Sequence, residues 1–328
     1  MDIFSTGVLS RVVAELPAPQ PFILNSFFGA VQTETSEEIH FDLELGRRRL
    51  SPFVSPIVAG QVVQSKGYRT NTFKPAYVKD KRVFDPSRPF KRSIGERIGG
   101  ELNPAQRLQA MLASELKDQI EMLARRQEVM AVEALRTGKI TVTGDLYPTV
   151  EVNFGRDAAL QPAGLAGAAR WGQVGVDPLA DLQKWSLLVT EKSGAAANIV
   201  IMDPKAYALF AASAPVQKLL DRFRGRDAMN STVIGEGGRY MGSTGDFDIY
   251  VYAGWYEDPV SGNLTPYLPD NTVIITSEQL EGVRAYGAIR DEEAGFQAVP
   301  YFSKSWARRT RRCATCCCSP RRCPCPTA

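Results

Sequence analysis

Residues 103–138 read NPAQRLQAMLASELKDQIEMLARRQEVMAVEALRTG, and they predict one long amphipathic helix around which the rest of the chain is arranged. Asn103 suits the cap and Pro104 the first turn, because the first backbone N–H groups of a helix have no partner inside it. Gly138 can supply the left-handed residue that ends a helix. At about 1.5 Å per residue such a helix would reach roughly 50 Å, so we interpret it as a spine for other elements.

One stripe of this helix is apolar, with residues recurring at spacings of three, four and seven positions. The stripe consists of Leu108, Leu112, Leu116, Ile120, Leu123, Met130 and Ala134. We expect the charged residues Lys117, Asp118, Arg125 and Glu128 to lie on other faces of the helix. One arm of a bundle or coiled coil is the alternative interpretation, although the stripe is too irregular for strict heptads.

A chain of 328 residues with 44% hydrophobic side chains can bury the core of one large domain or two smaller ones. It contains no run of about 18 apolar residues, and its start lacks the basic-then-apolar order of a secretion signal. We therefore expect an intracellular globular protein that does not enter a membrane.

The cysteines and the excess of basic charge both belong to the last part of the chain. All six cysteines lie at or beyond Cys313, which excludes a disulfide framework or a cysteine-ligated metal in the first 312 residues. Residues 307–328 contain six arginines and no acidic residue, so the net charge is +3 with them and −3 without them. The basic balance is therefore poor evidence that the body of the protein binds nucleic acid.

Around the long helix the pattern predicts a mixture of helices and strands, which is an α+β protein. Strict alternation of Ile39, Phe41, Leu43 and Leu45 with polar residues predicts a half-buried strand. The remaining predicted elements are helical patterns at 8–16, 178–192, 204–210 (capped by Asp203) and 216–223, an apolar cluster at 22–28, and strands at 139–144, 149–155, 198–202, 239–243, 247–256, 272–277 and 296–306. GEGG, residues 235–238, is expected to follow no strand and to open no helix, so we interpret it as a loop without phosphate binding.

Catalysis finds little support in the sequence. The one histidine, His40, lies among the polar positions of the predicted strand, and without a second histidine a nucleophile–His–acid arrangement has no base. We predict no catalytic residue, no metal site and no cofactor.

Residues 60–92 predict a long β-hairpin that is both basic and aromatic. Nine lysines and arginines face two aspartates there, a local charge of +7. The aromatic residues could stack on the bases of a single-stranded nucleic acid, or the basic arm could lie across an acidic face of another copy of the chain. Composition leaves both open. The candidate intersubunit contacts are Lys66, Arg69, Phe73, Lys74, Tyr77 and Lys79.

Four separated motifs resemble one known family. They are FVSPIVAGQVVQSKGYRTNTFKPAYVKDK (53–81), KITVTGDLYPTVEVNFGR (139–156), NIVIMDPKAYALF (198–210), and LPDNTVII (268–275) followed by RAYGAIRD (284–291). In this order they resemble the lambda-type tailed-phage major capsid proteins, the capsid E family, from about residue 20 to Trp306.

This resemblance implies the tailed-phage major capsid fold in four parts. The parts would be an N-terminal arm with the first strand (1–52), an extended loop hairpin (53–95), a peripheral domain with the spine helix (96–160, joined by a returning strand at 295–306), and an axial α/β domain (161–294). The extended loop would lie over a neighbouring subunit. Some members of the wider fold join subunits covalently through a lysine of this loop, but we assign no cross-linking residue here.

The implied function is self-assembly into hexamers and pentamers of an icosahedral phage head that encloses packaged double-stranded DNA, with no enzymatic turnover. The implied partners are other copies of the chain, a scaffolding protein, a portal protein and a decoration protein. The implied location is the virion, preceded by the host cytoplasm during assembly. A body of charge −3 is compatible with a shell that encloses DNA without sequence specificity. The alternative function is a nucleic-acid-binding module that uses the hairpin at 60–92.

Three interpretations remain for the Cys/Arg-rich tail, residues 307–328. Cys313 and Cys316 have the CxxC spacing of a zinc site, and the arginines could bind DNA. We favour translation out of frame, because the same nucleotides read two bases later can spell an acidic turn followed by an apolar strand. The chain would then lack its native last strand, and the peripheral sheet would lose an edge partner.

Overall fold

The computed structural model describes residues 6–36, 38–45, 50–57, 60, 62–63, 65, 67–83, 91, 96, 102–144, 147–220 and 233–305. The chain divides into two compact units, one of Met1–Leu16, Asp85–Ser114 and Tyr301–Ala328, the other of Pro17–Phe84 and Glu115–Pro300. Within the described residues, each helix is too short or too polar to cross a lipid bilayer. The predicted division into an arm, a hairpin and two domains stays a prediction.

The long helix α3 spans Pro104–Thr137, as predicted, and both of its ends are capped. The Asn103 side chain accepts a hydrogen bond from the Gln106 N–H (2.8 Å), and the Gln106 side chain accepts one from the Asn103 N–H (2.9 Å). Gly138 has φ 69°, the left-handed conformation that favours glycine. The guanidinium of Arg156 donates to the carbonyls of Ala134 and Arg136, so a cation satisfies the last turn.

The smaller unit contains α1 (Thr6–Glu15) and the first turns of α3. Leu9 and Val13 of α1 are buried, as is Leu112 of α3. Arg107 donates to both oxygens of the Glu96 carboxylate, which is almost fully buried, with the closest N–O distance at 2.8 Å. This pairing compensates the burial of both charges.

The larger unit is built on a five-stranded sheet in the order β12-β6-β9-β8-β7. β6 (Ile199–Met202) lies parallel to β9 (Asp248–Tyr252) and antiparallel to β12 (Val273–Thr276). β8 (Gly238–Ser243) and β7 (Val233–Ile234) continue the sheet in antiparallel fashion. Two short 3-10 helices, η2 (Ala158–Leu160) and η3 (Gly167–Ala169), precede α4 (Pro178–Ser193).

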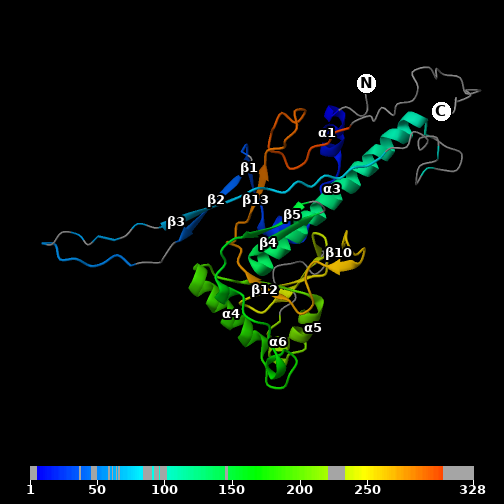
Figure 1. Cartoon of the computed structure of the whole chain (residues 1–328). Helices are drawn as coiled ribbons and strands as arrows, with labels where there is room; N and C mark the ends of the chain where they lie inside the picture. The colour runs from blue at the N-terminus through cyan, green and yellow to red at the C-terminus, as the bar shows by residue number, and fades with distance from the viewer. Residues whose placement is uncertain are drawn as a thin grey trace, which may run out of the picture. The chain divides into compact units, whose positions relative to one another are not determined.

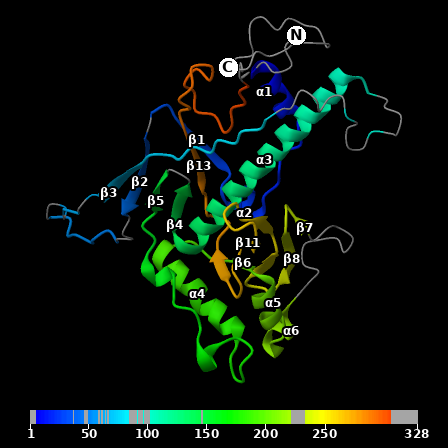
Figure 2. The same ribbon diagram turned by 45° about the vertical axis from the view of Figure 1, so that its right-hand side comes forward.

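Both faces of this sheet are covered by helices. Ile199 and Ile201 pack with α2 (Phe22–Phe27) and with Ala131, Val132 and Leu135 of α3. Val200 and Met202, which alternate with them along β6, pack with α4, α5 (Pro204–Ala211) and α6 (Ala214–Leu219). In Figures 1 and 2, α4, α5 and α6 accordingly lie across the strands from α3. The predicted α/β unit is confirmed, including Asp203 as the cap of α5.

Four further pairs of strands surround this core. β1 (Ala30–Glu34) pairs in parallel with β13 (Val283–Gly287). β2 (Ile39–Leu45) pairs antiparallel with β3 (Gly67–Phe73), β4 (Lys139–Gly144) with β5 (Tyr147–Asn153), and β10 (Trp255–Glu257) with β11 (Leu264–Pro266). β4 and β5 follow α3 directly, as the sequence predicted.

Several predictions about single segments were wrong. The strand YRTNTF pairs with β2 rather than with a strand inside 60–92, and described residues 74–83 form no strand. Pro75 has no N–H to donate to a ladder, in keeping with the end of β3 at Phe73. In GEGG, residues 235–237 form the turn between β7 and β8 and Gly238 begins β8, so the motif does follow a strand. The helix predicted at 216–223 is α6, which ends at Leu219.

The returning strand predicted at 295–306 is not seen in described residues 295–305. Gly295 and Phe296 both have positive φ values (61° and 55°), which an extended strand does not allow, and Pro300 lacks the N–H that a ladder needs. The tail at 307–328 lies outside the described residues.

Candidate subunit interface

The candidate interface is a ribbon, which we define as residues 39–83: β2, the connection that follows it, β3 and the return segment 74–83. In Figure 1, β2 and β3 lead away from the five-stranded sheet. The ladder pairs seven residues of each strand, from Ile39 opposite Phe73 to Leu45 opposite Gly67. In a two-stranded ribbon each strand pairs along one edge only and leaves its other edge open. Such a pair is only marginally stable alone, so contacts at its base must hold it in place.

The base of the ribbon is fixed by an apolar face and a polar face. On one face Ile39 is buried, and the Phe41 ring lies 6.1 Å from the Phe73 ring and 5.9 Å from the Phe154 ring. On the other face the His40 ring nitrogen Nδ1 lies 2.9 Å from the Thr72 hydroxyl. In the described part of β2, alternate residues thus face a packed apolar side and a polar side, as the alternating pattern predicted. His40 belongs to the polar side and makes a structural hydrogen bond there.

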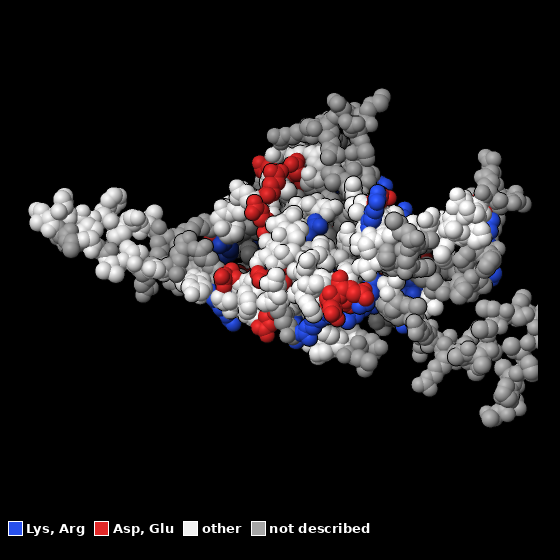
Figure 3. Space-filling model, turned by 90° about the horizontal axis from the view of Figure 1, so that it is seen from above, with Lys and Arg blue, Asp and Glu red and all other residues white. Residues whose placement is uncertain are grey.

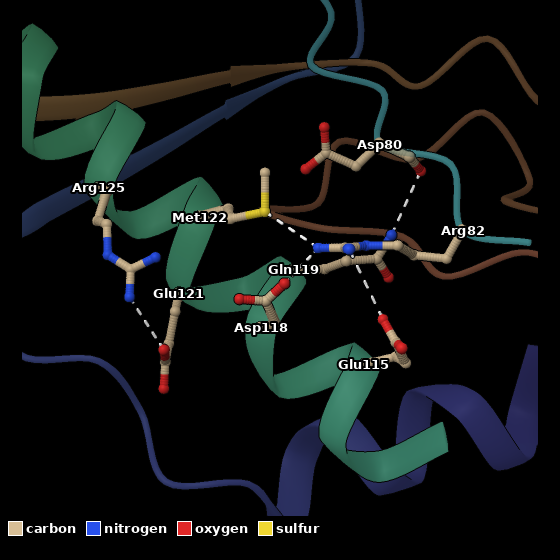
Figure 4. Close-up of polar contacts among 8 residues, drawn as sticks. All are labelled: Asp80, Arg82, Glu115, Asp118, Gln119, Glu121, Met122 and Arg125. Carbon is tan, nitrogen blue, oxygen red and sulfur yellow. Dashed lines mark hydrogen bonds and ion pairs between the residues drawn. The ribbon is translucent and has the colours of Figure 1, made fainter. Parts of the chain in front are cut away.

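The return segment is held against α3 within the same unit (Figure 4). The guanidinium of Arg82 forms ion pairs with Asp118 and, at 3.7 Å, with Glu115. The side-chain amide of Gln119 donates to the Asp80 carbonyl (3.4 Å). One basic residue of the predicted hairpin is thus already neutralised by its own subunit rather than by a neighbour.

The six predicted contact residues have different surroundings. Arg69, Lys74 and Lys79 are exposed, whereas Phe73 is partly buried at the base of the ribbon. The Tyr77 hydroxyl donates to the Ala288 carbonyl (3.0 Å), and the Lys79 ammonium lies 5.1 Å from the centre of the Tyr77 ring. The structure thus brings Tyr77 and Lys79 together.

Lys66 lies outside the described residues. For all six residues, contact with a second subunit stays a prediction.

The candidate contact residues did not include any from the apolar outer part of the ribbon, which we call the tip, residues 50–63, although the predicted extended loop at 53–95 contains most of it. Residues 50–63 contain no charged side chain, and Figure 3 accordingly shows mostly uncharged surface at the outer end of the ribbon. Leu50, Phe53, Ile57 and Val62 have between 95 and 107% of their surface exposed. The sequence did contain a signal for this surface, since an uncharged run precedes the basic region. The candidate contacts, however, were chosen from the basic and aromatic residues that follow that run. A group of exposed apolar side chains such as these marks a surface for another molecule.

The described residues offer no alternative site for a metal ion, since no three or more His, Cys, Asp or Glu side chains among them gather to hold one. The CxxC pair Cys313 and Cys316 lies outside this part of the chain.

Comparison with known proteins identifies the family. The chain matches the family described as phage major capsid protein E over residues 5–312. It is 32% identical over 318 residues to the major capsid protein of Escherichia phage N15, covering 94% of this chain and 91% of the relative. It is 31% identical over 316 residues to the major capsid protein of Escherichia phage lambda, covering 93% and 90%.

A solved structure gives the same result for the fold. The crystal structure of a capsid protein from a prophage of E. coli CFT073 matches with a TM-score of 0.68 at 22% identity, covering 88% of this chain and 85% of the other. The predicted α+β capsid fold is thereby confirmed.

The family match ends at Arg312, so it includes the first six residues after Trp306 and leaves the cysteines outside. Across the preceding residues the predicted resemblance is confirmed, and with it the expectation that the protein is not an enzyme. The chain belongs to the phage major capsid protein E family, whose members are structural proteins of the phage head.

Proposed function

We propose that this chain assembles into hexamers and pentamers of an icosahedral phage head that encloses packaged double-stranded DNA. The observation that carries this proposal is the ribbon, because its exposed apolar tip has no function in an isolated subunit. The named relatives are major capsid proteins, which supports the same assignment.

The tip supplies the favourable free energy of association. Full burial of a Leu, Ile, Val or Phe side chain contributes about 1.5–3 kcal/mol, and four such side chains are almost fully exposed in the subunit. Because the tip of one copy would dock on a different surface of the next, the contact is head-to-tail and can close into a ring. Every subunit of a ring then gives one such contact and receives one.

Charge has a secondary function in this proposal. Arg69, Lys74 and Lys79 are exposed near the base of the ribbon and can steer it toward an acidic surface of the neighbour. Each exposed pair contributes only about 0–1 kcal/mol. Without its tail the chain has a net charge of −3, so we infer that it surrounds DNA rather than gripping it.

The proposed partners are a scaffolding protein during assembly, a portal protein at one vertex, and a decoration protein on the outer surface. The proposed locations are the host cytoplasm during assembly and the virion afterwards.

Electron microscopy and sedimentation of the purified chain with its scaffolding protein test this function. We expect capsomers, tubes or closed shells. A monomer at all concentrations would contradict the proposal. A small uniform species bound to single-stranded nucleic acid would support the alternative, in which the basic ribbon is a nucleic-acid-binding surface.

A further inference from the structure

The short helix α2 has an unusual cap at its N-terminus. It has only six residues, too few to be stable alone, and Pro21 before it makes no side-chain cap bond. Its first-turn N–H groups, of Ile23 and Leu24, instead donate to the two carboxylate oxygens of Glu128 on α3, each at 2.8 Å. The Tyr252 hydroxyl of β9 donates to the same carboxylate at 2.8 Å. Glu128 therefore caps a helix that is remote in sequence.

Glu128 is 1% exposed, although the sequence pattern placed it off the apolar stripe of α3. Burial raises the pKa of the Glu128 carboxyl, while its three hydrogen bonds act in the other direction. Because both oxygens accept hydrogen bonds, the geometry is that of the ionised carboxylate.

The other end of α2 is held by a cation. The Arg284 guanidinium on β13 donates to the carbonyls of Leu24 (2.9 Å) and Phe28 (2.5 Å) and to the Asn25 side-chain oxygen (2.8 Å). A negative group at the N-terminus and a positive group at the C-terminus both match the helix dipole. Next to Arg284, the Gly282 N–H donates to the Phe27 carbonyl at 2.7 Å. A Cβ at Gly282 would clash with the Phe28 ring, so only glycine allows this approach.

Both arms of the ribbon are anchored at β13, the outgoing arm through β1 and the return arm through Pro75 and Tyr77. On the outgoing side, β1 follows α2 and pairs with β13, with Val31 opposite Arg284, and β2 begins a few residues later. On the return side, the Tyr77 hydroxyl donates to the Ala288 carbonyl just after β13. Pro75 lies so close to Gly287 that a Cβ on residue 287 would be 2.7 Å from the proline ring. A two-stranded parallel ladder is marginal alone, so its position depends on what holds β1 and β13 to the core.

We propose that Glu128 and Arg284 are positioning residues for assembly: together they clamp α2 between α3 and β13 and so set the direction in which the ribbon leaves the subunit. The inference rests on the proposed function, because this direction matters only if the ribbon engages another copy. The seven residues of β2 alone extend about 23 Å, so a rotation of about 10° at the base moves the far end by about 4 Å. An error of that size would separate a tip from its docking surface.

The test measures the ribbon in the unassembled subunit. Spin labels are placed on Tyr68→Cys in β3 and Leu187→Cys in α4, both exposed, in the full chain with its six tail cysteines changed to serine. Pulsed electron resonance gives the distance distribution between the labels. We expect Arg284→Met and Glu128→Gln to shift or broaden it by about 4 Å or more, as the lever length implies. Arg239→Met, an exposed arginine on β8, is the matched control and should change nothing.

Circular dichroism confirms that each variant is folded at the temperature of measurement. If Arg284→Met does not fold, Arg284→Lys replaces it, because lysine keeps the charge but cannot make all three hydrogen bonds. An unchanged distribution in folded variants at both positions would overturn the inference.

Electron microscopy of the same variants supplies the second measurement, and we expect irregular or open shells. Regular shells from a variant with a displaced ribbon would also contradict the inference. If the parent chain forms no shell at all, the proposed function fails, whereas the distance measurement still decides whether the clamp sets the ribbon.

Discussion

Truncating Phe53 to alanine separates the association of subunits from the folding of each subunit. Phe53 is fully exposed in the tip, so Phe53→Ala leaves no cavity and should change the free energy of unfolding by no more than about 0.5 kcal/mol. If the ring is buried in a neighbour, its loss costs about 1.5–3 kcal/mol per contact. Because about 1.4 kcal/mol corresponds to a factor of ten, the critical concentration for assembly should rise by about 10- to 100-fold.

Light scattering and sedimentation at a fixed concentration of scaffolding protein measure that critical concentration. Phe296→Ala is the matched control, because Phe296 is also exposed (61%) but lies outside the ribbon. Assembly of Phe53→Ala at the concentration of the parent would refute the argument that the tip is buried between subunits. A clear drop in the melting temperature of Phe53→Ala would refute the claim that the subunit folds independently of this ring, because the ring would then pack on its own subunit.

Three further predictions concern buried charge, surface charge and the tail. Glu128→Gln should lower the free energy of unfolding by about 1–3 kcal/mol in urea denaturation, because an amide cannot accept from all the donors and leaves one buried N–H unpaired. Burial raises the pKa of Glu128, whose charge also interacts with Tyr252 and Glu236. The folded parent therefore binds the proton more tightly than the unfolded chain, and its free energy of unfolding should fall as pH rises from 4.5 through the raised pKa. The Gln variant should lack this pH dependence. Lys74→Glu with Lys79→Glu should slow assembly at low salt and have less effect as salt rises, and equal rates at low salt would show that these charges do not guide docking. Mass spectrometry of the assembled protein tests the tail: we expect a mass without the Cys/Arg-rich residues, and competent particles that contain them would contradict out-of-frame translation.

The sequence was most informative where a signal and its partner lie close together in the chain. The bounds of α3 followed from Asn103, Pro104 and Gly138, and the start of α5 followed from Asp203, because caps act over three or four residues. Burial of both faces of β6 agreed with its continuous apolar run.

The sequence was least informative where the partner is remote. Glu128 was placed off the apolar stripe, and nothing nearby in the sequence suggests that it is buried and accepts hydrogen bonds from backbone N–H groups 104 and 105 residues away. For the same reason β3 was assigned a local partner, although it pairs with β2, which lies on the other side of the tip. For the candidate interface, the resemblance predicted an extended loop at 53–95 that includes most of the tip, but the candidate residues were all chosen from the basic, aromatic part that follows it. Lys74 and Lys79 are exposed and Phe73 packs at the base of the ribbon, while contact of these residues with a second subunit stays a prediction.

The bond between Arg284 and the Leu24 carbonyl joins residues 260 positions apart, and this has a consequence during synthesis. At roughly 5–20 residues per second, a ribosome needs about 13–50 seconds to add that length of chain. Until β13 emerges, β1 has no strand to pair with, and the ribbon has no fixed seat. Under the proposed assembly, a nascent chain cannot direct its ribbon toward a finished subunit before β13 has been synthesised, so only nearly complete chains would join a shell.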